Sequence, residues 1–168
     1  HSIRRRQRQM CIRDRTNVAD MRALATKYGR EEKIGFGMRL QIICREKEQE
    51  AWDVAEGLVR NVTDDQRDVI KTHFANSVAN QRVRQLAEEY GEKISPNMWT
   101  GLTKARPGAG VVIVGNPEQC AKTLQDYIDI GCHSFCLSGY LHDEEAERFG
   151  KWVRPLLFEK NPDRMKVI

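Results

Sequence analysis

A phenol and an imidazole stand two residues apart in the last third of the chain. Tyr140 and His142 follow an apolar run at 133–137. Both side chains can donate and accept protons, so the pair could carry out general acid–base chemistry. The same spacing fits a turn that holds a packed tyrosine and a solvated histidine, and the residues alone leave both interpretations open.

Two arginines are candidates for binding an anion. Arg39 lies inside an apolar segment, where a buried guanidinium would need a partner. That partner could be an anionic ligand inside a barrel or a structural carboxylate. Arg106, with Lys104 nearby, lies in a segment rich in Gly and Pro. There a mobile cation could close over a sulfonate or phosphate, or could be an ordinary solvated charge.

The cysteines do not predict a metal site. Cys132, His133 and Cys136 lie along one predicted strand, which would point their side chains to opposite faces, and no second ligand pair follows. Five cysteines are an odd number without the spacing of a disulfide scaffold. We therefore expect reduced thiols in a cytoplasmic protein.

The elements that must position these residues alternate between strands and helices. Apolar, β-branched runs predict strands, the clear ones being 34–44 and 133–137, with a shorter run at 111–114. The segment 94–110 contains two prolines and three glycines, and we predict a long loop there. Asn116 and Pro117 predict the cap and first turn of a helix. Helical periodicity or composition indicates helices at 17–30, 47–61, 64–74, 77–90, 117–130 and 144–157, the last capped by Asp143.

This alternation predicts a parallel α/β architecture, in which catalytic groups gather at the carboxyl ends of the strands. The chain has 168 residues, which is short of the ~250 that a complete (β/α)8 barrel typically needs. No apolar run is long enough to span a membrane, and the N-terminus has no apolar leader, so we expect neither membrane insertion nor secretion.

The net charge of +4 comes from the first fifteen residues, which hold six arginines against one aspartate. Residues 4–15 look like a translated sequencing-adapter string, so we treat 1–15 as an artefactual or disordered tail and 16–168 as the folded part. A basic arm that binds nucleic acid is the other interpretation of this tail. The rest of the chain shows no basic stripe with interleaved aromatics, and we expect no nucleic-acid partner.

Several motifs, in order and spacing, resemble the C-terminal part of the flavin-dependent alkanesulfonate monooxygenases of the bacterial luciferase-like family. The resemblance covers roughly residues 17–157. The segments Ser-Pro-Asn-Met-Trp and Ser-Gly-Tyr-Leu-His are together its most specific part, whereas the Gly-Asn-Pro-Glu helix start is weak alone. The motifs lie at 36–40, 45–52, 94–99, 105–110, 114–118 and 137–146.

The resemblance implies the C-terminal part of a TIM (β/α)8 barrel with an inserted helical region and a mobile loop. Its two clear strands would be the seventh and eighth, and such a fragment is expected to be inactive alone. The family uses reduced FMN as a co-substrate with O2 to convert an alkanesulfonate to an aldehyde and sulfite. An NADH- or NADPH-dependent FMN reductase supplies the reduced flavin, and the full-length enzymes form homo-oligomers.

The resemblance also assigns roles to single residues. Arg39 matches a strand arginine that acts on the flavin adduct or the sulfonate, and Arg106 matches the loop arginine that closes over flavin and substrate. Tyr140 and His142 match the site pair after the last strand, with Tyr140 near the flavin. Gln41, expected to bind substrate, stands where the sulfonate enzymes commonly carry a histidine. Leu141 replaces a common proline, so a relative acting on another small substrate is the alternative.

A hypothesis of a different class is a non-catalytic α/β binding module. It would use the same sheet without flavin chemistry, and the basic tail would serve as an arm for nucleic acid. Salt-dependent binding that disappears when residues 1–15 are deleted would support this module.

Overall fold

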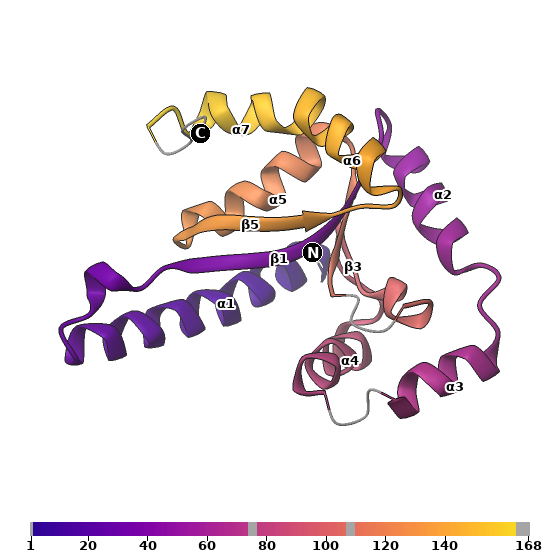
Figure 1. Ribbon diagram of the computed structural model, residues 1–168, viewed down its shortest axis with the longest axis horizontal. Helices are drawn as coiled ribbons and strands as arrows, with labels where there is room; N and C mark the ends of the chain where they lie inside the picture. The colour runs from indigo at the N-terminus through magenta and orange to yellow at the C-terminus, as the bar shows by residue number, and fades with distance from the viewer. Residues whose placement is uncertain (1, 74–76, 107–109, 164–168) are drawn as a thin grey trace.

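The computed structural model describes residues 2–73, 77–106 and 110–163. Strands and helices alternate from α1 to α2 and again from β4 to α6, whereas three helices and then two short strands follow one another between these parts (Figure 1). Three short elements add to them: 3-10 helices at Glu31–Lys33 and Gly101–Lys104, and a π-helical segment at Phe149–Val153. The strands and α-helices are α1 (Ser2–Lys27), β1 (Phe36–Cys44), α2 (Glu48–Val59), α3 (Asp64–His73), α4 (Val78–Tyr90), β2 (Lys93–Ser95), β3 (Met98–Trp99), β4 (Val112–Gly115), α5 (Pro117–Asp129), β5 (Cys132–Ser138), α6 (His142–Arg148) and α7 (Arg154–Lys160).

The five strands form one mixed sheet in the order β2-β3-β4-β1-β5. β1 lies between β4 and β5 and pairs with both in parallel fashion, as the alternation of strands and helices predicts. β2 and β3 pair with each other, and β3 pairs with β4, in antiparallel fashion. The predicted α/β class is therefore confirmed, with two antiparallel strands added at one edge.

The prediction of a long loop over 94–110 is wrong in its first half. Pro96 and Asn97 form the turn of a short hairpin, and Met98 and Trp99 pair with Ile113 and Val112 of β4. A strand of two residues has no periodicity to detect, because the neighbouring strand supplies its hydrogen bonds. Residues 107–109 lie outside the described part of the chain.

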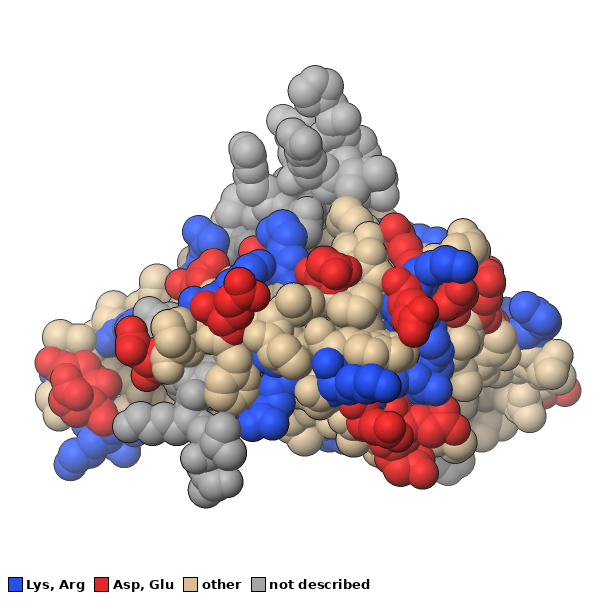
Figure 2. Space-filling view, turned by 90° about the horizontal axis from the view of Figure 1, so that it is seen from above, with Lys and Arg blue, Asp and Glu red and all other residues tan. Residues whose placement is uncertain are grey.

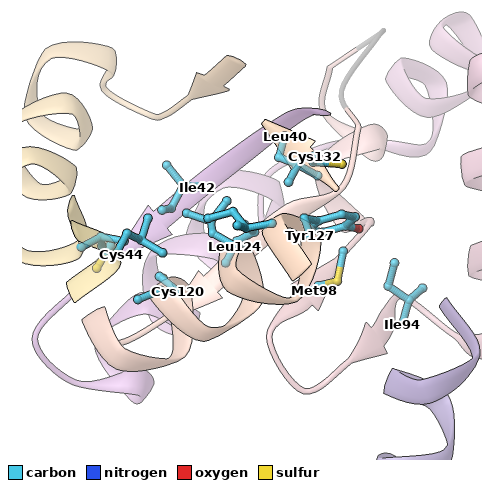
Figure 3. Close-up of a cluster of buried hydrophobic side chains, with 14 residues drawn as sticks. Leu40, Ile42, Cys44, Ile94, Met98, Cys120, Leu124, Tyr127 and Cys132 are labelled. Carbon is cyan, nitrogen blue, oxygen red and sulfur yellow. The ribbon is translucent and has the colours of Figure 1, made fainter. Parts of the chain in front are cut away.

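One face of the sheet is covered by helices and holds the larger hydrophobic core. Leu40 and Ile42 of β1 point toward Leu124 and Tyr127 of α5 in this core (Figure 3). Val153 of the π-helical segment and Leu157 of α7 also belong to this core, and both are buried. Burying a Leu, Ile or Val side chain typically contributes about 1.5–3 kcal/mol, so this face fixes the sheet to α5 and α7.

The other face of the sheet is covered only in part. Ile43, Val112 and Val114 pack there against Ala51 and Trp52 of α2, and Trp52 meets Trp99 edge to face at 6.4 Å between ring centroids. Beyond α2, where β1 pairs with β5, this face has no such apolar cover among the described residues. Every second residue of the two strands is polar or glycine there: Gly37, Arg39, Gln41, Ser134, Cys136 and Ser138.

β5 differs from the buried strand that its composition predicts. Within the described residues it pairs only with β1, so it forms an edge of the sheet. Ser134 and Cys136 are exposed, and Phe135 and Leu137 are half-buried on the opposite face. An apolar run therefore identified the strand correctly and its burial incorrectly, because burial depends on neighbours that a single segment does not reveal.

The helix boundaries follow local signals closely in one case and loosely in another. Asn116 caps α5 in a full capping box with Gln119, Pro117 opens the helix, and Gly131 follows its end with φ of +103°. By contrast, Leu141 and not Asp143 is the N-cap of α6, so Asp143 lies in its first turn. α1 begins at Ser2, and its helix includes residues that we set apart as a tail.

Within the described ranges, no helix is both long enough and apolar enough to cross a membrane. Lys and Arg side chains alternate with Asp and Glu over the face shown in Figure 2.

Candidate functional site

The polar residues on the open face of β1 and β5 form a continuous strip, which we call the polar strip: Arg39, Gln41, Ser134, Cys136 and Ser138. Arg39 is the register partner of Cys136, and Gln41 is the register partner of Ser138. Parallel partners lie on the same face of a sheet, so these side chains project to one side. The strip runs toward the carboxyl ends of both strands.

Arg39 is exposed, and the expectation of a buried guanidinium is wrong. No hydrogen bond or ion pair joins its side chain to another described residue. The apolar run around it made burial the natural prediction, but its face of β1 lies beyond the cover of α2. An unpaired cation on an open strip can bind an anionic ligand without first breaking an internal ion pair.

Gln41 is the buried member of the polar strip, with 6% of its surface exposed. Its Oε1 atom has no hydrogen-bond partner in the described part of the chain. A buried carbonyl oxygen without a partner costs about 1–3 kcal/mol. The structure thus leaves one strong acceptor unused beside the exposed arginine.

Arg106 and Tyr140 meet at the carboxyl end of the same face. Arg106 Nη1 donates a hydrogen bond of 2.6 Å to Tyr140 Oη, and its guanidinium lies 5.7 Å from the centroid of the tyrosine ring. The ring packs against the second core, which α2 and Trp99 build. Lys104, the other cation of this segment, pairs with Glu92. Arg106 is therefore the cation that this segment directs toward the predicted site pair.

His142 lies at the start of α6, and its ring centroid is 5.9 Å from that of Tyr140. Its side chain is exposed. It also lines an apolar groove of about 890 Å³ beside β5, together with Phe135 and Leu137 from the covered face. His142 therefore stands at the rim between the polar strip and this groove, which makes it a more peripheral member of the site than Tyr140.

A buried carboxylate that the sequence reasoning missed ties α6 to the end of β1. Glu145, 2% exposed, accepts a hydrogen bond of 3.0 Å from the backbone N–H of Cys44 at the end of β1. It also pairs with Arg45 and, at 3.0 Å, with Arg148 Nη1. Partial burial opposes the shift, but hydrogen bonds and the charges of Glu144 and Glu145 raise the pKa of the Arg148 guanidinium above its usual value.

This network fixes the segment that carries Tyr140 and His142. Gly139 lies so close to Glu145 that an added Cβ would stand 2.2 Å from the glutamate Cβ. A signal for this role existed in the sequence, because Glu145 occupies the same helical stripe as Phe149, Val153 and Leu157. A charged residue on an apolar stripe indicates a buried, paired group.

The residues of the polar strip fit an anionic, ring-containing cofactor such as FMN. The orphaned oxygen of Gln41 would accept from a ring N–H, and the Arg106–Tyr140 pair offers a guanidinium and an aromatic face. Among the described residues no cluster of three metal-ligating side chains occurs. The polar strip, with Arg106, Tyr140 and His142 beyond its carboxyl end, can supply charge, hydrogen bonds and proton-transfer groups to a bound organic ligand.

Comparison with known proteins identifies both a family and a fold. The family model described as luciferase-like monooxygenase matches residues 13–134. Among solved structures, the crystal structure of DmoA from Hyphomicrobium sulfonivorans is similar, with a TM-score of 0.66 at 20% sequence identity. The similarity covers 94% of this chain and 37% of that chain, so this chain spans little more than a third of the length of the protein it matches.

Proposed function

We propose that this chain, which belongs to the luciferase-like monooxygenase family, is the C-terminal part of a monooxygenase that oxidises an alkanesulfonate with FMNH2 and O2. Luciferase-like monooxygenases generally use reduced flavin. The observation that carries the proposal is the hydrogen bond between Arg106 and Tyr140 just beyond the carboxyl end of β5, together with the exposed Arg39 on the polar strip. Active sites of parallel α/β folds gather at that end.

The same proposal includes a complete (β/α)8 barrel in the full-length protein. Three features support it: the parallel run β4-β1-β5, the open edge of β5, and an apolar groove beside that edge. An unpaired strand edge next to an apolar groove is normally covered in a stable protein. Further strands and helices of the same protein would cover both, and the polar strip would then face the barrel interior.

In this proposal Arg39 binds the sulfonate, because an exposed guanidinium matches a sulfonate in charge and in hydrogen-bonding geometry. Arg106 closes over the bound molecules while Tyr140 holds its guanidinium in place. Closure excludes water and strengthens the electrostatic contacts inside. Reduced FMN, when bound, supplies the electrons that activate O2.

Conversion of the sulfonate carbon to an aldehyde removes one C–H proton, breaks the C–S bond and releases sulfite. One atom of O2 enters the aldehyde and the other leaves as water. Tyr140 Oη accepts its bond from Arg106, so its own proton remains available for transfer. His142 can exchange that proton with solvent at the rim of the site.

The partners follow from this chemistry. A flavin reductase that uses NADH or NADPH would supply FMNH2, and the full-length enzyme would form a homo-oligomer in the cytoplasm. A luciferase-like enzyme that acts on another small substrate is the second candidate, because Gln41 cannot titrate and Leu141 changes the turn between the two site residues.

The test is sulfite release by the full-length protein with a flavin reductase, NADPH, O2 and alkanesulfonates of increasing chain length. We expect sulfite and aldehyde in equal amounts, and a loss of kcat/KM of roughly 10- to 150-fold in Arg39→Ala, since a charge-assisted contact contributes roughly 1.5–3 kcal/mol. Arg154→Ala removes an exposed arginine that stacks on Phe158 of α7 and serves as the matched control. Flavin oxidation without sulfite from any sulfonate would favour the second candidate.

A further inference from the structure

The side-chain oxygen of Gln41 is the one buried side-chain polar atom in the described part of the chain that lacks a partner. Its residue lies at the centre of β1, between register partners Val112 and Ser138. Neither neighbour relieves it: valine has no polar side chain, and no hydrogen bond joins the Ser138 hydroxyl to the amide. Arg39 precedes it by two residues on the same face.

An unused buried acceptor calls for a donor from outside the chain. A glutamine oxygen takes N–H or O–H groups and repels other acceptors. A sulfonate at neutral pH carries three acceptor oxygens and no proton, so it cannot satisfy this atom. A reduced isoalloxazine carries several N–H groups, and a hydroxyl or amide on a substrate would carry the same kind of donor.

We propose that Gln41 recognises an N–H or O–H donor of the bound ligand, with reduced flavin as the source, and that the sulfonate is left to Arg39. The inference rests on the proposed function and sharpens it, because it moves Gln41 from the substrate to the cofactor. It also implies that the unpaired oxygen of Gln41 destabilises the ligand-free protein, and that ligand binding removes this destabilisation.

Two measurements on the full-length protein test this, with Gln41→Leu as the variant and Gln41→Met as a second variant closer to glutamine in shape. The first is urea unfolding without ligand, where removal of an unpaired oxygen should raise the midpoint. The second is the anaerobic dissociation constant of FMNH2, measured by the quenching of tryptophan fluorescence. This constant should rise about tenfold, since a typical hydrogen bond corresponds to about one factor of ten. Gln49→Leu, an exposed glutamine bonded to Asp53 on α2, is the control and should change neither.

The outcomes distinguish a donor on the flavin from a donor on the substrate, and failure of the Gln41 inference from failure of the proposed function. A higher midpoint with weaker FMNH2 binding supports the inference. A higher midpoint with unchanged FMNH2 binding, but a raised KM for the sulfonate, assigns the donor to the substrate and overturns the flavin assignment. A lower midpoint in both variants shows that the amide already has a partner, such as water, and overturns the inference. A wild-type protein that binds no FMNH2 overturns the proposed function itself.

Discussion

Replacing Glu145 with alanine should lower the free energy of unfolding by about 3 kcal/mol. Its carboxylate is 2% exposed and accepts from Cys44 N–H, Arg45 and Arg148. Removing one partner of a buried ion pair typically costs about 3–5 kcal/mol. The arginine side chains retain 16% and 24% exposure, so water can partly solvate them afterwards, and the lower end of that range applies.

The assay is urea unfolding followed by circular dichroism. With a typical slope of about 2 kcal/mol per molar, a loss of 3 kcal/mol moves the midpoint by about 1.5 M. Glu145→Gln keeps the shape and an acceptor for Cys44 N–H but loses the charge, so its loss should be smaller, about 1–2 kcal/mol.

Glu144→Ala is the matched control for this experiment. Glu144 precedes Glu145 on α6 and pairs with Arg148 at 2.7 Å, but its side chain is 49% exposed. Exposed ion pairs contribute about 0–1 kcal/mol. A Glu145→Ala midpoint equal to that of Glu144→Ala would refute the reasoning, because burial would then have made no difference to the network.

Two further predictions concern glycines and thiols. Gly139→Ala should destabilise the protein by about 1–3 kcal/mol, because the added Cβ would overlap Glu145. Gly57→Ala, in open space on α2, should stabilise the protein by about 0.5–1 kcal/mol. Thermal unfolding of the two variants compares these effects. A hydrogen bond with Cys44 and burial raise the pKa of the Cys120 thiol well above its usual value. The native state therefore keeps the thiol proton of Cys120. The stability that this protonated thiol contributes is present below the usual thiol pKa of about 8.5, and it is lost as pH rises through the pKa of the thiol in the folded protein. The urea midpoint should fall between pH 7.5 and pH 10, and less so in Cys120→Ala; an equal fall in that variant would contradict this assignment.

Local signals predicted the elements whose structure is decided locally. The Asn116–Pro117 helix start and the apolar run of β1 are each determined by neighbouring residues in the sequence, and both predictions are confirmed. The motifs also predicted the luciferase-like family correctly, although the finer assignment to alkanesulfonates stays a proposal.

Features that depend on distant neighbours were not predictable in the same way. The β2–β3 hairpin exists because β4 offers it an edge, and the exposure of Arg39 follows from where α2 stops covering the sheet. Glu145 was overlooked because two of its three partners, Cys44 and Arg45, lie about one hundred positions away in the sequence. A single sequence shows which residues are polar, and only the packed sheet shows which of them share a face.

Reduced flavin should lie over the polar strip, and Cys136 reports on that directly. Its thiol is exposed, it is the register partner of Arg39, and the cysteines at 44, 120 and 132 are buried. The measurement is the alkylation rate of Cys136 by iodoacetamide in the anaerobic full-length protein, quantified by mass spectrometry, with and without saturating FMNH2. The proposed site predicts that FMNH2 slows this alkylation at least tenfold. An unchanged rate at saturating FMNH2 would place the flavin elsewhere and contradict the site.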